Sequence, residues 1–414
     1  MTNSRTQRAK IRDRASTRRE AISQGDKESL KGNPFFLQNF SIDALMDEAS
    51  DKSDFHRDWG FQLLPRNDPA FRDPEYLKGL HALAVPTITN FGGTAGPLLQ
   101  TYLSAFEDLA SGRIVDFAPS GTSANNLLLS YADEALHRRQ MEKNKELKVR
   151  SKSTLIFLDD PYVGLQGELA YQKYNPESLI RGVPVIHPNR TLGVKETQDL
   201  ALREEKTLEK IAKMIDDPNS TVGGIFLEPI SVNHGPVRIY RSEFLKNLQK
   251  IAHERGVPVF ADEIMSGGGR TGKFWGYQHY RDFVPDVLIF GKGLVLSGLF
   301  IPKESELGGK LQKGSMSSYT TASNSLALLQ ALQVLKALKS RKLIENAQMA
   351  GQTLRERLIK EANLNEDSVR CVGLMCSVEG TPRVLHTYGS RWLPPITLDN
   401  ADIDDLIKEM KSSP

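Results

Sequence analysis

A lysine between two glycines, Gly291-Lys292-Gly293, directly follows a short apolar run in this chain. An exposed lysine is ordinarily a solvated charge. A lysine held at the end of a buried strand is partly desolvated, which lowers the pKa of its amine and makes it nucleophilic. Upstream, Asp262 ends the apolar run Val257–Ala261, and ligands of open α/β sheets bind beyond such strand ends. The plainer interpretation is that Asp262 only caps a turn.

A segment of small and polar residues, Pro119–Asn125, joins a predicted strand to a predicted helix. Backbone N–H groups at a helix N-terminus bind anions, although an ordinary Ser/Thr cap is the simpler explanation. The combination is more specific than its parts. A phosphate site, then an acid, then a lysine are what pyridoxal 5′-phosphate (PLP) requires. We therefore expect Asp262 beside the pyridine nitrogen and Lys292 as the Schiff-base lysine.

The glycine-rich run Gly267–Phe274 suggests a competing nucleotide site. It matches G-x-G-x-x-G, and it nearly matches G-x-x-x-x-G-K-[ST], with Phe274 in place of the final hydroxyl residue. A dinucleotide site requires the motif between the first strand and helix of its unit, whereas aromatic residues follow it here. A nucleotide-binding NTPase is therefore the weaker alternative. A non-catalytic protein of PLP fold is weaker still, because Lys292 and Asp262 are both present.

Between residues 112 and 292, short apolar runs alternate with amphipathic stretches, which predicts an α/β domain with a mostly parallel sheet. The predicted strands are Ile114–Ala118, Thr154–Asp159, Val183–His187, Val222–Glu228, Val257–Asp262 and Asp286–Phe290. Residue Ser242 is expected to cap a helix that Gly256 stops in the left-handed conformation. Later elements are predicted as helices at Ser323–Leu338 and Leu343–Glu361, a strand-like segment at Ser377–Leu385, and a helix carrying Ile403 and Met410.

These elements suggest four parts of the chain. We expect a basic arm over residues 1–32 that need not be ordered and an N-terminal segment over 33–80 that packs on the small domain or on a dimer partner. A large PLP-binding domain is expected over 81–315, followed by a small C-terminal domain over 316–414. The arginine-rich start permits a mitochondrial transit peptide but favours a solvated arm, and it lacks the apolar segment of a secretory signal.

Composition limits the class of protein. The 414 residues carry a net charge of +3, which excludes a chain-wide basic surface for nucleic acid. No apolar run reaches the ~20 residues that span a bilayer. Two cysteines, Cys371 and Cys376, cannot make a disulfide framework, and no histidine lies near them to suggest a metal site. We expect a cytoplasmic protein that binds neither membranes nor nucleic acid.

Taken in order, the motifs resemble those of the class III aminotransferases of the ornithine and 4-aminobutyrate type, which have PLP fold type I. The matching motifs are Ser120-Gly121-Thr122-Ser123-Ala124-Asn125, Glu228-Pro229, Asp262-Glu263-Ile264, Gly267-x-Gly269-Arg270-Thr271-Gly272, Pro285-Asp286, Gly291-Lys292-Gly293 and Arg391-Trp392-Leu393-Pro394-Pro395. The resemblance implies a central, mostly parallel sheet flanked by helices and a smaller α+β C-terminal domain. It also implies an aminotransferase that acts on an amino acid or amine.

The resemblance further implies a role for each matched residue. Lys292 would be the Schiff-base lysine and proton shuttle, and Asp262 would bind the pyridine nitrogen. The other cofactor residues would be Ser120, Gly121 and Thr122 at the phosphate, Ile264 and Tyr162 on the two ring faces, and Thr320 from the neighbouring subunit of a homodimer with shared active sites. Glu228 and Arg391 resemble a pair that gates and binds a substrate carboxylate.

Two departures from the family pattern surround the substrate. Met265 stands where many members have a Gln that bonds the cofactor's phenolic oxygen, and Val163 stands where they have a His. These differences do not affect the phosphate site or the lysine, so they leave PLP use intact. They keep open a non-transaminating PLP enzyme of the same fold, namely a racemase, decarboxylase, lyase or carbon–carbon bond-forming enzyme.

Overall fold

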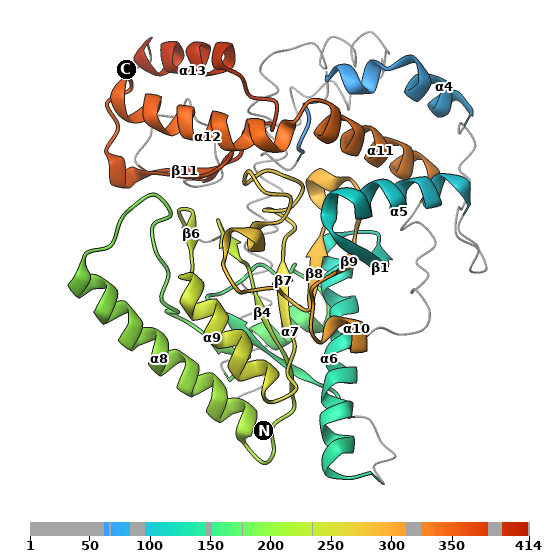
Figure 1. Cartoon of the computed structure of the whole chain (residues 1–414), viewed down its shortest axis with the longest axis vertical. Helices are drawn as coiled ribbons and strands as arrows, with labels where there is room; N and C mark the ends of the chain where they lie inside the picture. Colours follow the sequence, from blue (N-terminus) through green and yellow to red (C-terminus); the bar gives the residue numbers. More distant parts are fainter. Residues whose placement is uncertain are drawn as a thin grey trace, which may run out of the picture. The chain divides into compact units, whose positions relative to one another are not determined.

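A seven-stranded sheet forms the centre of the part of the chain described by the computed structural model, which covers residues 62–65, 68–82, 96–145, 151–175, 177–233, 235–311, 324–379 and 391–412 (Figure 1). The strand order is β1-β9-β8-β7-β4-β2-β3. The strands are β1 (Gly112–Ala118), β2 (Thr154–Leu158), β3 (Leu179–Ile180), β4 (Val222–Leu227), β7 (Val259–Asp262), β8 (Val287–Phe290) and β9 (Ser297–Pro302). Within this sheet only β9 pairs antiparallel. The carboxyl ends of the other strands therefore meet at one edge.

Both faces of the sheet are buried, which explains the continuous apolar runs of its strands. On one face, Phe226 and Phe260 pack with the helix α6 (Gly121–Lys143). The alternate residues Ile225 and Val259 belong to the core of the opposite face. That face is covered by helices α5 (Pro97–Ala110), α8 (Val194–Asp216) and α9 (Ser242–His253) (Figure 1). At about 25 cal/mol per Å² of buried apolar surface, this packing is the main source of stability.

A second, antiparallel sheet follows near the C-terminus. It consists of β10 (Val369–Val372), β11 (Met375–Val378) and β12 (Arg391–Trp392), in that order. Helices α11 (Ser325–Ser340), α12 (Leu343–Lys360) and α13 (Asn400–Ser412) accompany it. The remaining elements are α4 (Pro74–Ala82), α7 (Glu168–Lys173), α10 (Gly308–Leu311), β5 (Ile230–Ser231), β6 (Arg238–Ile239) and the 3₁₀ turns η2 (Pro69–Arg72), η3 (Gly276–His279), η4 (Lys292–Leu294) and η5 (Glu366–Ser368).

The predicted fold class is confirmed, two local expectations are corrected, and one strand was not predicted. The strand expected at Val183–His187 is wrong: β3 occupies the place beside β2, and this stretch contributes only a bridge between Ile186 and Ile239. Strand β9 was missed. Helix α9 begins at Ser242, so Ser242 does not cap it; Arg241 stands at the cap without a side-chain bond. Gly256 does take the left-handed conformation, with φ of 65°.

The two cysteines lie opposite each other in the hairpin of β10 and β11, where they form a disulfide. This single bond joins residues five positions apart, so it is not a framework of the kind that the sequence analysis excluded. Cys371 also exchanges two backbone hydrogen bonds with the side chain of Asn189. The hairpin is thereby attached to the segment before α8.

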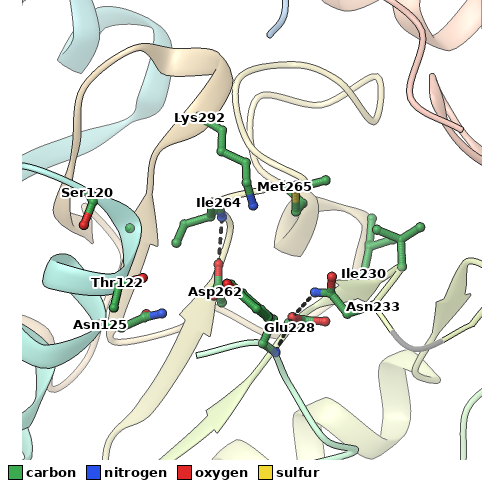
Figure 2. Close-up of a pocket in the computed structure, with 13 residues that line it drawn as sticks. Ser120, Thr122, Asn125, Glu228, Ile230, Asn233, Asp262, Ile264, Met265 and Lys292 are labelled. Carbon is green, nitrogen blue, oxygen red and sulfur yellow. Dashed lines mark hydrogen bonds between the residues drawn. The ribbon is translucent and has the colours of Figure 1, made fainter. Parts of the chain in front are cut away.

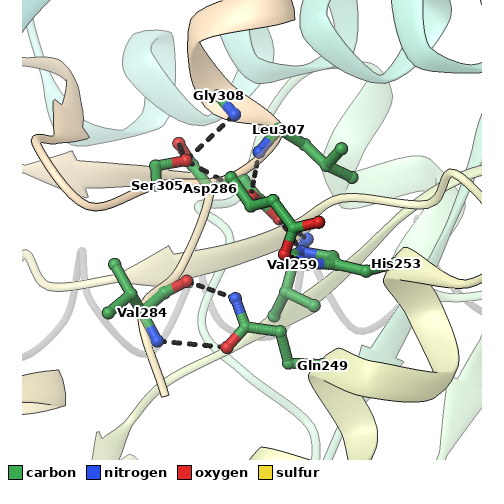
Figure 3. Close-up of polar contacts among 9 residues, drawn as sticks. Gln249, His253, Val259, Val284, Asp286, Ser305, Leu307 and Gly308 are labelled. Carbon is green, nitrogen blue, oxygen red and sulfur yellow. Dashed lines mark hydrogen bonds and ion pairs between the residues drawn. The ribbon is translucent and has the colours of Figure 1, made fainter. Parts of the chain in front are cut away.

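A buried carboxylate fixes the start of β8 (Figure 3). Asp286 is fully buried, and one carboxylate oxygen accepts the N–H of Val259 at 2.8 Å while the other accepts the N–H of Leu307 at 3.0 Å. The ring of His253 lies 2.8 Å from the same carboxylate and 3.0 Å from Glu306. Burial lowers the pKa of His253, but the bonds to the two carboxylates outweigh it and leave the pKa raised. These contacts anchor the start of β8, the strand whose other end leads into Lys292.

Two kinds of feature are absent from the described residues. None of their helices is long and apolar enough to cross a membrane. No three of their His, Cys, Asp or Glu side chains are grouped in a way that could hold a metal ion.

Candidate active site

Lys292 lies just beyond the carboxyl end of β8 and points into a pocket of about 190 Å³ (Figure 2). Its backbone φ of 46° is in the left-handed region, which a residue with a side chain rarely occupies. Burial lowers the pKa of its amine, while the negative charges of Asp262 and Glu228 oppose that shift. A lowered pKa increases the uncharged, nucleophilic fraction of the amine.

Asp262 ends β7, the strand next to β8, and lines the same pocket. The parallel register pairs Asp262 with Ile289, so the chain needs only three more residues to bring Lys292 to the same edge. The Ile264 N–H donates to the Asp262 carboxylate at 2.9 Å. Burial, and then the charge of Glu228, raise the pKa of Asp262 to about 7, although the Ile264 bond and Lys292 lower it. A cationic partner would stabilise the ionised form further.

The N-terminus of α6 closes a third side of the pocket. Ser120 is the N-cap, and its hydroxyl accepts the Ser123 N–H at 3.2 Å. Gly121 and Thr122 begin the first turn and line the pocket. A Cβ on Gly121 would lie 2.6 Å from Cδ1 of Ile264, so glycine permits the helix to approach that side chain. With 23 residues, α6 presents free N–H groups and the positive end of its dipole here.

The predicted ring-stacking residues also line this pocket. Ile264 is 9% exposed, and Tyr162 is 41% exposed. Met265 contributes its thioether to the lining, and Val163 is buried against the core beneath α6. Thr320 lies outside the described residues.

The two residues expected to handle a substrate carboxylate are connected through a third, Asn233. The amide nitrogen of Asn233 donates to Glu228, and its oxygen accepts from Arg391 Nη1 at 3.2 Å. Glu228 is 6% exposed and also accepts from the Tyr162 N–H at 2.9 Å and from the Ser231 hydroxyl at 2.7 Å. The structure therefore brings Glu228 and Arg391 to one place, with an amide between them that the sequence analysis missed.

The glycine-rich loop serves packing, because protein atoms occupy the space beside its glycines. A Cβ would lie 2.7 Å from Leu63 at Gly268, from Ile344 at Gly269 and from Gln348 at Gly272. All three glycines have positive φ. The side chain of Arg270 is buried and donates to the carbonyls of Gln62 and Pro394. The loop does not line the Lys292 pocket, and the weak nucleotide-binding interpretation finds no support in this geometry.

The pocket fits a phosphorylated aromatic cofactor with a basic ring nitrogen. Asn125 lines the pocket and is 1% exposed, yet its Oδ1 has no hydrogen-bond partner within the described part of the chain. A buried polar atom without a partner costs ~1–3 kcal/mol, so a ligand group is expected beside it. The helix N-terminus suits a phosphate, Asp262 suits a protonated nitrogen, and the Lys292 amine suits an aldehyde. The sequence analysis included Asn125 in the segment Pro119–Asn125 but gave it no role of its own, because its burial depends on strands far along the chain.

Comparisons with known proteins agree with this chemistry. The family model described as "Aminotransferase class-III" matches residues 85–410. A [LysW]-aminoadipate semialdehyde/glutamate semialdehyde transaminase from Sulfolobus acidocaldarius is 26% identical over 79% of this chain and 76% of its own length. An acetylornithine aminotransferase from Synechocystis sp. is 32% identical, over 38% of this chain and 36% of its own.

The fold is also found among solved structures. A lysine aminotransferase from M. tuberculosis superimposes with a TM-score of 0.71 at 21% sequence identity, covering 85% of this chain and 87% of the other. At that identity the likeness concerns the fold. The family match extends over most of the chain and includes every described residue of the pocket. The chain belongs to the class III aminotransferases, a family of PLP-dependent enzymes.

Proposed function

We propose that this protein is a PLP-dependent aminotransferase that moves an amino group between an amino acid or amine and a keto acid, with Lys292 as its catalytic amine. One observation carries the proposal. Lys292 and Asp262 reach a single pocket from neighbouring strands, and the N-terminus of α6 borders that pocket. Family membership supports the same reaction class.

Ser120, Gly121 and Thr122 would hold the phosphate, Asp262 the ring nitrogen, and Ile264 and Tyr162 the two ring faces. When bound, PLP supplies an electron-withdrawing ring that accepts the electron pair left on the substrate carbon. Asp262 would keep that ring nitrogen protonated, because a buried carboxylate favours a cationic partner. Lys292 would hold the cofactor through its amine, and the same amine would take up the substrate's proton and return it.

The substrate side of the proposal rests on Arg391, whose guanidinium would bind a carboxylate by charge-assisted hydrogen bonds. The two relatives described above are named for amino acid derivatives, the semialdehydes of aminoadipate and glutamate and acetylornithine. An amino acid or one of its derivatives is therefore the proposed substrate class.

The protein is further proposed to be a cytoplasmic homodimer with shared active sites. Thr320 of each subunit would contact the phosphate of the PLP bound in the other subunit. The apolar helix α11 does not provide the dimer interface, because most of its apolar side chains are buried within the chain. Better support comes from Leu165, Tyr171 and Tyr174, which are exposed apolar residues in the segment after Tyr162. The four-part division at residues 32, 80 and 315 remains part of the proposal.

The reaction is tested with the purified holoenzyme, a panel of amino donors and 2-oxoglutarate. Transamination yields one glutamate for each donor consumed, whereas a racemase, decarboxylase or lyase consumes donor without glutamate. For the shared site, mixing inactive Lys292→Ala and Thr320→Ala chains should restore activity in heterodimers with one intact site. A fully active monomer in sedimentation would exclude the shared site.

A further inference from the structure

Asn233 connects the acid and the base of the candidate carboxylate site (Figure 2). Its amide nitrogen donates to a Glu228 carboxylate oxygen, and its amide oxygen accepts from Arg391 Nη1 at 3.2 Å. It lines the same pocket as Lys292 and Asp262. Arg391 itself is not among the lining residues, and its contact with Asn233 connects it to the pocket.

The chemistry of the two neighbours determines which way the amide points. A carboxylate only accepts hydrogen bonds and a guanidinium only donates them. The NH₂ group must face Glu228 and the oxygen must face Arg391. Only a side chain that carries both a donor and an acceptor at this place serves both neighbours.

Glu228 accepts three hydrogen bonds from described residues. Besides Asn233, it accepts from the Tyr162 N–H and from the Ser231 hydroxyl. All three donors are uncharged. A chain of hydrogen bonds thus runs from the main chain of Tyr162, through Glu228 and Asn233, to Arg391.

We propose that Asn233 determines how tightly this pocket binds a carboxylate. Its uncharged amide positions Arg391, and a substrate carboxylate can replace the amide in that contact. This inference rests on the proposed function, in which Arg391 is the carboxylate-binding residue. The hydrogen bond from the guanidinium to the amide oxygen has one charged partner, whereas a substrate carboxylate adds a second, opposite charge and can accept two parallel N–H bonds from the guanidinium. Exchanging the amide for the substrate is therefore favourable.

The substitution Asn233→Asp tests this exchange with almost no change in shape. At neutral pH the introduced carboxylate attracts Arg391 and competes with the ligand, and it can no longer donate to Glu228. At low pH the protonated acid regains one donor and one acceptor, which reproduces the amide. The like charge of Glu228 raises the pKa of the introduced acid, whereas the guanidinium of Arg391 lowers it, so binding is followed on acidification from pH 8 to pH 5.5 and below. Misfolding of the pocket would not be reversed by acid in this way.

The assay is calorimetric titration of the PLP-loaded enzyme with glutarate, a dicarboxylate that is not turned over, with 1,5-pentanediol as the uncharged control. Asn233→Asp should weaken glutarate ~10- to 100-fold at pH 8, the range expected for a charge-assisted contact. The loss should shrink toward pH 5.5. Asn233→Ala, which adds no charge, should cost less than Asn233→Asp at pH 8, and binding of pentanediol should not change.

The variant Arg391→Ala separates this inference from the proposed function. If Arg391→Ala weakens glutarate but Asn233→Asp does not, or if the Asn233→Asp loss is independent of pH, the role of Asn233 is overturned and that of Arg391 stands. If Arg391→Ala leaves glutarate unchanged, or the wild-type enzyme binds it no better than pentanediol, the carboxylate-binding role of Arg391 fails, and the inference fails with it.

Discussion

Replacing Asp262 by Asn should stabilise the cofactor-free protein while it destroys activity. Burial and the charge of Glu228 raise the pKa of Asp262 from its ordinary 3.8 to about 7. A buried acid with a raised pKa binds more protons in the folded state than in the unfolded one, so it lowers stability as pH rises from about 4 to 7. At about 1.4 kcal/mol per pKa unit, this amounts to roughly 4 kcal/mol above pH 7.

The neutral amide introduced by Asp262→Asn would keep the acceptor for the Ile264 N–H and remove the charge. We expect about 2–4 kcal/mol of stabilisation, seen as several degrees in melting temperature, at pH 8 and little at pH 5. Turnover of the PLP-loaded variant should fall by orders of magnitude, because the ring nitrogen loses its anionic partner. Scanning calorimetry of the cofactor-free protein and a glutamate assay of the loaded enzyme measure the two effects.

Asp286 is a matched control, because it is also a buried aspartate and directly precedes β8, the strand next to the one that Asp262 ends. Asp286 accepts two backbone N–H groups and contacts His253, so Asp286→Asn removes a carboxylate that is well paired. It should lower the melting temperature at pH 8. A similar decrease for Asp262→Asn, or near-wild-type turnover of that variant, would refute the reasoning.

Three further results are expected. Gly121→Ala should weaken PLP binding in an absorbance titration, because the new Cβ would lie 2.6 Å from Ile264 Cδ1; unchanged affinity would contradict the close approach. His253 has a raised pKa, so its stabilising contact with Asp286 is fully present below pH 6.5 and is lost as pH rises through the folded-state value; the dependence of melting temperature on pH in this range should flatten in His253→Gln. Arg270→Met should lower the melting temperature markedly, since it leaves two main-chain carbonyls unpaired at ~1–3 kcal/mol each; a loss under about one degree would argue against that role.

The strand ends that carry chemistry could be predicted from the sequence. Asp262 and Lys292 each follow an apolar run, and such runs form buried parallel strands whose carboxyl ends share one edge. The local sequence pattern was sufficient to locate these two strands, because a strand buried on both faces requires an unbroken run of apolar residues. The same reasoning failed at Val183–His187, which is as apolar as β3 but does not pair beside β2.

Contacts between distant segments could not be predicted in this way. Strand β9 contains small and polar residues, and its identity as a strand depends on pairing with β1 and β8 on either side. Asn233 lies in none of the motifs, and Asn125 was one residue of the segment Pro119–Asn125 without a role of its own. Their significance comes from Arg391, more than 150 positions later, and from the strands that bury α6.

The central claim is that Lys292 carries the cofactor, and borohydride reduction followed by peptide mapping tests it most directly. Reduction of the yellow holoenzyme should fix PLP to a single lysine, Lys292, and Lys292→Ala should retain PLP through its phosphate contacts but show neither fixation nor turnover. Lys273 is a built-in comparison, because it is an exposed lysine in the glycine-rich loop, away from the pocket. Label on Lys273 or any other lysine of the wild-type chain would contradict the account.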